Sequence, residues 1–278
     1  MAGKKSRSDR PKLVGRGDRT SAIPDENLFE YAICGNGAVL TGLSDEVEIP
    51  RDQTVSIPSA LGGFPVVAIR EVAFSRCKYL SDVDIPNTVV SIGDGAFAAS
   101  YITSLHIPSS VASIGKEAFV DTYDLRSIEV DPSNPFYSTI DGCLVEYNGV
   151  DLLRFSSKEQ GASIVIPKGV HFIRSRAFSC CDASSIAMKE VARIEEAAFF
   201  ACSHLTSVKL SDDLMSIGDL AFWGCSKLAQ IEIPQSVHAM GKDVFRDCSP
   251  DLVLTVTEGS YAERWAEENG VAYRHCQK

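Results

Sequence analysis

The stretch Ile217–Cys225, which reads IGDLAFWGC, decides the fold because it recurs along the chain. With Phe222 as the origin, the same frame surrounds six other phenylalanines. Successive copies lie 21 to 23 residues apart, except for one gap of 59 residues. The seven phenylalanines are Phe74, Phe97, Phe119, Phe178, Phe199, Phe222 and Phe245. Because a repeat of this length cannot bury its apolar side alone, the pattern indicates a solenoid of stacked coils.

Four columns of the repeat carry apolar or small side chains. The residue eight before each phenylalanine is Val or Leu, and the residue five before it is Ile or Met. The residue immediately before it is Ala or Val, and the residue three after it is Cys, Ser or Thr. Alternating apolar residues that follow, such as Leu80, Val83 and Ile85, predict a short strand with one buried face. Each coil is therefore expected to hold a strand, a second short extended run and a tight turn around the phenylalanine.

The repeated unit resembles the BspA-like leucine-rich repeat family, whose unit reads I-P-x-x-V-x-x-I-G-x-x-A-F-x-x-C-x-x-L. Residues 107–125, IPSSVASIGKEAFVDTYDL, follow this pattern, and the resemblance extends from about Tyr31 to Tyr273. It implies a right-handed solenoid of mainly β structure, with a parallel sheet on one face, short helical turns and a C-terminal capping helix. Coils of 22–23 residues are expected.

The chain is expected to consist of a tail and one repeat domain. Residues 1–27 form a basic tail without apolar periodicity, for which disorder is expected, and residues 28–278 form a single leucine-rich-repeat solenoid. Its expected parts are an N-terminal unit at 28–65, repeats at 66–130, a long repeat with a hairpin at 131–169, repeats at 170–249 and a C-terminal cap at 250–278.

Local signals place the turns and the last helix. Asp141-Gly142 and Asn148-Gly149 predict hairpin turns inside the long repeat. Ser260 is the predicted N-cap of a helix at 261–269, which Gly270 should end.

Charge and hydropathy limit the classes of partner. The chain has a net charge of −10, and its first twenty residues carry seven Lys or Arg against two Asp, or +5, which leaves about −15 for the rest. Such an acidic solenoid argues against nucleic acid as a partner. No run approaches the roughly 18 apolar residues of a membrane span, and the N-terminus lacks the apolar core of a secretory signal. The resemblance implies a cell-surface or secreted protein of an anaerobic bacterium or a protist, whereas the missing signal favours a cytoplasmic location if Met1 is the true start.

Nothing in the sequence predicts catalysis or a cofactor. Of nine cysteines, five occupy one column of the repeat, where free thiols pack as small apolar groups. No C-x-x-C pair or metal-binding histidine spacing is present, and no serine or cysteine lies in a nucleophile elbow. The glycine four before several of the phenylalanines is not a phosphate loop, because Arg and Glu replace it in other copies. We therefore expect no catalytic, metal or cofactor site and no enzyme activity.

The candidate contacts are with a protein partner. Outward positions of the predicted strands form one candidate face, although its lack of aromatic anchors leaves a merely solvated surface as the alternative. These residues are Asp82, Asp84, His106, Glu129, Lys209, Gln230 and Glu232. Phe200 and Trp223 each follow a repeat phenylalanine and predict an apolar patch on the turn edge. Arg16, Gly17 and Asp18 in the tail form the tripeptide that integrin ligands present.

These observations favour a monomeric, non-catalytic binding module. The resemblance implies adhesion to host or matrix proteins such as fibronectin or fibrinogen, or contact between bacteria. The alternative is a cytoplasmic structural scaffold that is not exported.

Overall fold

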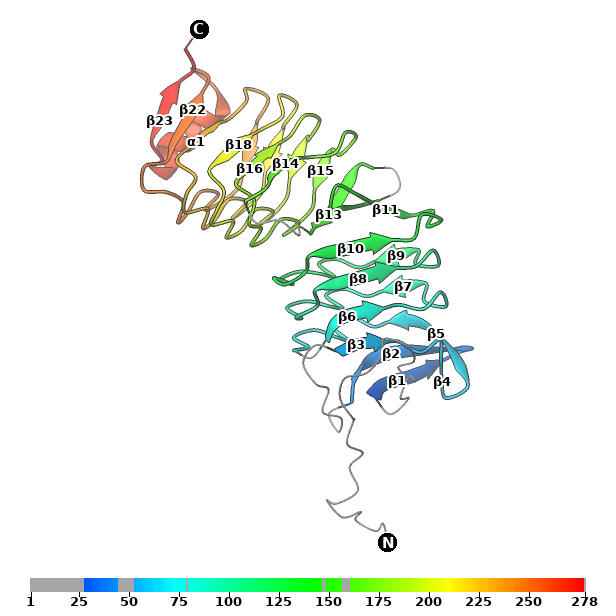
Figure 1. Ribbon diagram of the computed structural model, residues 1–278. Coiled ribbons are helices and arrows are strands. Elements are labelled where there is room, and N and C mark those ends of the chain that lie inside the picture. Colours follow the sequence, from blue (N-terminus) through cyan, green and yellow to red (C-terminus); the bar gives the residue numbers. More distant parts are fainter. Residues whose placement is uncertain (1–27, 45–52, 79, 147–148, 157–160, 278) are drawn as a thin grey trace, which may run out of the picture.

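The computed structural model describes residues 28–44, 53–78, 80–146, 149–156 and 161–277. In these residues the chain winds into an elongated solenoid of about nine turns with a spacing of about 22 residues (Figure 1). Its strands are mostly parallel, and within the described part the single helix lies close to the C-terminal end. The predicted solenoid fold is confirmed.

The coils up to Val130 build two sheets on different sides of the stack. One sheet is parallel, in the order β10-β8-β6-β3, and the other runs β1-β2-β5-β7-β9, with the short β4 beside β5. The first contains β3 (Gln53–Ser56), β6 (Leu80–Asp84), β8 (Ser104–Ile107) and β10 (Ser127–Val130). The second contains β1 (Phe29–Cys34), β2 (Gly37–Leu43), β4 (Ala60–Leu61), β5 (Phe64–Ile69), β7 (Ser91–Ile92) and β9 (Ser113–Ile114).

Three further sheets build the rest of the stack. A seven-stranded sheet in the order β11-β12-β13-β15-β17-β19-β21 begins with the hairpin strands, and two three-stranded sheets cover the other side. The seven strands are β11 (Tyr137–Ile140), β12 (Cys143–Glu146), β13 (Asp151–Phe155), β15 (Phe172–Ile173), β17 (Arg193–Ile194), β19 (Ser216–Ile217) and β21 (Ala239–Met240). The others are β14 (Ser163–Val165), β16 (Ser185–Ala187) and β18 (Ser207–Lys209), then β20 (Gln230–Glu232), β22 (Val253–Val256) and β23 (Tyr273–His275).

The repeat phenylalanines stack ring on ring along the inside of the solenoid. They form two stacks, Phe74 to Phe119 and Phe178 to Phe245, in which neighbouring ring centroids lie 5.0–5.8 Å apart, the spacing of adjacent coils. Phe155 belongs to this column as well, because its ring lies 5.0 Å from that of Phe178. The repeat analysis missed Phe155, although it precedes Phe178 by 23 residues, one repeat length.

The turn around each phenylalanine alternates between residues with positive φ and residues without it. In all seven predicted copies, the residues two before and two after the phenylalanine have φ between 51° and 72°, and most of them are not glycine. This alternation points three N–H groups of each turn at the following coil. In one coil Gly95 N, Phe97 N and Ala99 N donate to carbonyl oxygens of the next coil at 2.8–3.0 Å. The turns are therefore joined by a ladder of backbone hydrogen bonds, here called the turn ladder.

The repeat glycine has a different role, since its φ is not positive. A Cβ on Gly93 would lie 2.4 Å from Glu71 N, and one on Gly218 would lie 2.6 Å from Glu196 N. These positions are glycine because the preceding coil passes too closely for a side chain.

The left-handed turn positions predict a stabilising substitution. Val72 is β-branched, 60% exposed and held at φ 52°, a conformation that costs such a residue about 1–2 kcal/mol. Because Asn tolerates this region far better, we expect Val72→Asn to raise the free energy of unfolding by up to about 1 kcal/mol. Urea titration measures this. Val90→Asn is the control, since Val90 is 49% exposed without a positive φ, and a gain of equal size there would contradict the strain argument.

The C-terminal helix closes the stack as the sequence predicts. Helix α1 (Tyr261–Asn269) begins after Ser260, whose side chain accepts a hydrogen bond from Glu263 N, and ends at Gly270 with φ 65°. Trp265 meets the ring of Phe245 edge-on at 6.0 Å, and its indole N–H donates to Gly241 O at 3.1 Å. The last coil therefore does not expose its apolar side to water.

Candidate functional site

Three parallel strands carry a candidate surface site. Strand alternation places Val83 and Leu105 toward the core and their neighbours outward. Because β6, β8 and β10 pair in register, Asp84, His106 and Glu129 form one row across the sheet. A second row consists of Asp82, Ser104 and Ser127.

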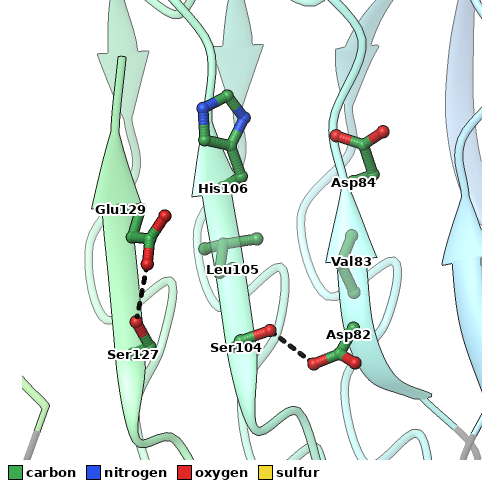
Figure 2. A pocket seen from close by; sticks show the side chains of 8 residues that line it. All are labelled: Asp82, Val83, Asp84, Ser104, Leu105, His106, Ser127 and Glu129. Carbon is green, nitrogen blue, oxygen red and sulfur yellow. Dashed lines mark hydrogen bonds between the residues drawn. The ribbon is translucent and has the colours of Figure 1, made fainter. Parts of the chain in front are cut away.

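The two rows enclose a shallow depression of about 210 Å³ (Figure 2). Asp82 is oriented by its neighbours, since its carboxylate accepts hydrogen bonds from the hydroxyls of Thr103 and Ser104. Ser127 donates to the carboxylate of Glu129 at 3.4 Å. Among the described residues, the side chains of Asp84 and His106 have no hydrogen-bond or ion-pair partner, so both are available to a ligand.

The structure separates the other predicted face residues from this depression. Lys209 on β18 and both Gln230 and Glu232 on β20 are exposed, but they belong to the coils after the hairpin. C-terminal residues contact two of them: Arg274 donates to the side chain of Gln230 at 3.5 Å, and the Cys276 thiol donates to Glu232 at 3.8 Å. The sequence period places all seven side chains outward, whereas the hairpin divides them between two surfaces.

The predicted turn-edge pair is in contact. The rings of Phe200 and Trp223 stack with centroids 4.5 Å apart and an angle of 13° between their planes. Arg176 of the preceding coil covers Phe200, with its guanidinium carbon 5.2 Å from the ring centroid, and also forms an ion pair with Asp121 at 3.6 Å. Sequence analysis missed Arg176, because the pairing depends on the reach of its side chain between coils. Phe200 therefore has Trp223 stacked on its ring and the Arg176 guanidinium over it.

The third predicted contact, Arg16-Gly17-Asp18, lies outside the described residues.

The surroundings of several cysteine thiols are those of packed structural residues. All nine cysteines are free. The thiols of Cys202, Cys225 and Cys248 each donate to a phenylalanine carbonyl of the preceding coil at 3.1–3.3 Å. Burial raises the pKa of the Cys143 and Cys181 thiols to about 12. Because the thiolate is the reactive form, a raised pKa makes these two thiols poorer nucleophiles at neutral pH than a free cysteine.

Within the described residues, no group of three or more His, Cys, Asp or Glu side chains could hold a metal ion. The same part of the chain contains no helix with the length and apolar character needed to cross a membrane.

A compact charge cluster lies where the hairpin meets the following coils. Arg174 contacts Asp151 and Glu195, each at 2.6 Å. The contact with Asp151 is ionic, without hydrogen-bond geometry. Burial, and next the negative charge of Asp151, raise the pKa of the neighbouring Glu146.

This cluster predicts a pH dependence of stability. A carboxyl whose pKa is higher in the folded chain than in the unfolded chain binds its proton more tightly when folded. Its stabilising contribution is therefore complete below the unfolded pKa and is lost as the pH rises through the folded pKa. Glu146→Gln removes the charge. We expect the stability of this variant to fall less with rising pH, and the variant to unfold at a higher urea concentration than the wild type at pH 7.5. Urea titrations of both proteins at pH 4.5 and 7.5 measure this difference. If both proteins lost the same stability between the two pH values, Glu146 would not be the source of the pH dependence.

The comparisons with known proteins agree with this geometry. A family model described as the BspA type leucine-rich repeat region matches residues 54–144 and 152–250 in six copies. The chain belongs to the BspA-type leucine-rich repeat family. The break in the match at 145–151 falls inside the hairpin, where this BspA-type chain departs from the regular repeat. A comparison with curated protein sequences finds no match.

Solved structures of similar shape come from bacterial proteins. A leucine-rich cell surface protein of Faecalibacterium prausnitzii A2-165 has 17% identity and a TM-score of 0.59, with 98% of this chain and 96% of that chain covered. The pneumococcal vaccine antigen PcpA has 18% identity and a TM-score of 0.48, with 84% and 81% covered. A leucine-rich repeat protein of Eubacterium ventriosum ATCC 27560 has 18% identity and a TM-score of 0.32, with 77% and 91% covered. At these identities the likeness concerns the fold alone, which is that of a leucine-rich repeat solenoid.

Proposed function

We propose that this BspA-type chain is a binding module for a protein partner, and that it serves adhesion at the cell surface. The sheet depression on β6, β8 and β10 supports this proposal most directly, because the side chains of Asp84 and His106 are aligned there with no hydrogen-bond partner among the described residues. Repeat proteins commonly bind partners over the extended surfaces that their aligned strands create. The fold likeness to a cell surface protein of F. prausnitzii is in keeping with a surface location.

The partner-binding surface is tested with two matched triple variants. Asp84→Asn, His106→Ala and Glu129→Gln together remove the charges and the imidazole of one row, and none of these side chains contributes to the core. Binding of the purified chain to immobilised fibronectin and to immobilised fibrinogen is measured for each variant. We expect binding to at least one of them, weakened about tenfold or more in this triple variant.

The control triple variant, Lys209→Ala, Gln230→Ala and Glu232→Gln, changes exposed residues beyond the hairpin and is expected to bind as the wild type does. Equal binding by both triple variants would contradict the assignment of the depression. Cell fractionation of the native organism tests the location, since protein found only in the cytosol would contradict adhesion and favour a structural scaffold.

A further inference from the structure

We infer that the solenoid consists of two units that share one internal cap and that each unit opens without the other. The first unit comprises the described residues up to Val130, and the second comprises those from Gly161 to the C-terminus. The shared cap consists of the described residues 131–146 and 149–156, which contain β11, β12 and β13. In Figure 1 these strands lie between the two stacks.

The buried side chains form two separate cores, and β12 divides them. Leu144 belongs to the first core, whereas Cys143 and Val145 on either side of it belong to the second. Adjacent residues of a strand face opposite sides, so β12 is a wall with one core on each face. On β13, Leu152 packs in the second core and Leu153 against the first.

The turn ladder stops at this wall. Within the described residues, the three ladder donors of the last regular coil before it, Glu117 N, Phe119 N and Asp121 N, have no hydrogen-bond acceptor. The ladder resumes where Phe155 N donates to Ala177 O at 2.9 Å. It stops once more at the C-terminal end of the stack, since Asp243 N, Phe245 N and Asp247 N also lack acceptors among the described residues. The coil of Phe119 is therefore built like the final coil of the whole solenoid.

A tyrosine hydroxyl closes each unit in the same way. Ile114 N, on the last strand of its sheet, donates to the hydroxyl of Tyr137 at 2.9 Å. Met240 N, on the last strand of the seven-stranded sheet, donates to the hydroxyl of Tyr261 at 3.4 Å. Tyr137 begins β11, the first hairpin strand, as Tyr261 begins helix α1, so the long coil caps the first unit as the helix caps the second.

Interruption of a sheet alone does not define such a boundary. β18 and β20 are also unpaired with each other, yet the core, the phenylalanine stack and the turn ladder all continue past them. At the hairpin the core, the phenylalanine stack and the turn ladder are all interrupted. The break in the stack lies between Phe119 and Phe155, whose rings do not stack.

The contacts that cross the boundary are mainly polar. Ser175 donates to Glu117 at 3.0 Å, and Arg176 pairs with Asp121 at 3.6 Å, both in partly exposed surroundings. Such pairs contribute little to stability. Arg154, 5% exposed, donates to Thr122 O at 3.2 Å and to Arg176 O at 3.0 Å, but its Nε has no partner. Stability in a solenoid is the sum of its units and of the contacts between neighbours, and no residue of the second unit belongs to the core of the first.

The division has a consequence for the proposed binding role. The depression formed by Asp82, Asp84, His106 and Glu129 lies entirely within the first unit. The depression should therefore persist when the second unit opens. Independent opening of the two units does not depend on which partner the depression binds.

Hydrogen exchange of the full chain, followed by mass spectrometry, tests the inference. Phe97→Leu weakens the stack of the first unit and Phe222→Leu that of the second. We expect Phe97→Leu to speed exchange of the slowest amides at 80–130 by at least about tenfold and to leave those at 185–256 unchanged, with the reverse for Phe222→Leu. If either variant speeds the slowest amides of both units by the same factor, the solenoid opens as one unit and the inference is wrong.

A matched tyrosine pair tests the caps with milder changes, in case a phenylalanine variant fails to fold. Tyr137→Phe should speed exchange in the first unit only, and Tyr261→Phe in the second only. Unchanged exchange in the first unit of Tyr137→Phe would overturn its role as a cap.

Discussion

Replacement of Phe199 by alanine is expected to lower the free energy of unfolding by about 3–5 kcal/mol. The side chain of Phe199 is fully buried, and its ring lies between those of Phe178 and Phe222 at 5.0 and 5.1 Å. Alanine would remove contacts on both ring faces and leave a cavity in the stack. The neighbouring rings cannot move in to fill it, because the turn ladder fixes the coils that carry them. A loss of this size is a large part of the 5–15 kcal/mol that stabilises a typical domain.

Urea titration followed by circular dichroism measures this loss. Phe136→Ala is the matched control, since Phe136 is 47% exposed and belongs to neither core. Its truncation should cost less than about 1 kcal/mol. Equal losses for the two variants would mean that the phenylalanine column does not carry the core.

The regular part of the fold could be predicted because each position occurs many times. The columns that contain Phe222, Ile217 and Cys225 repeat in seven copies. The phenylalanine column is buried throughout, and the other two are buried except for the partly buried Ile114, Cys77, Cys181 and Cys248. Helix α1 could be placed because Ser260 and Gly270 are strong local signals. The two left-handed positions of each turn could not be predicted, since Val72, Arg176 and Leu220 are residues that rarely adopt this conformation. Their φ values follow from the turn ladder, which is a property of neighbouring coils.

In the candidate site, too, the positions that repeat could be predicted and the irregular ones could not. The row of Asp84, His106 and Glu129 follows from the period, because equivalent residues of successive coils pair in register. The partition of the predicted face was not visible in the sequence, since it depends on where the hairpin enters the stack. Arg154 and Asn134 were missed for a related reason: each occurs once, in the irregular coil, so no column of the repeat marks its role.

Asn134→Ala is expected to cost about 2–4 kcal/mol, mostly from the first unit. This side chain is 5% exposed and takes part in four hydrogen bonds. Its amide donates to Pro108 O and Val111 O at 2.8 and 3.0 Å, and its oxygen accepts from the N–H groups of Phe136 and Tyr137 at 2.8 and 2.9 Å. Alanine would leave these four backbone groups without their partner, and a net hydrogen bond contributes about 1 kcal/mol.

The same amide orients the chain that brings Tyr137 to Ile114 N, so its loss should also loosen the cap of the first unit. Urea titration gives the total loss, and hydrogen exchange of the amides at 80–130 assigns it to that unit. Ser133→Ala is the control: Ser133 is exposed, its side chain bonds only to Asp131, and its truncation should change stability by at most about 0.5 kcal/mol. If Asn134→Ala unfolds at the same urea concentration as Ser133→Ala, the hydrogen bonds of Asn134 do not hold the cap. The first unit would then be closed mainly by the apolar contacts of Leu144, Leu153 and Tyr137.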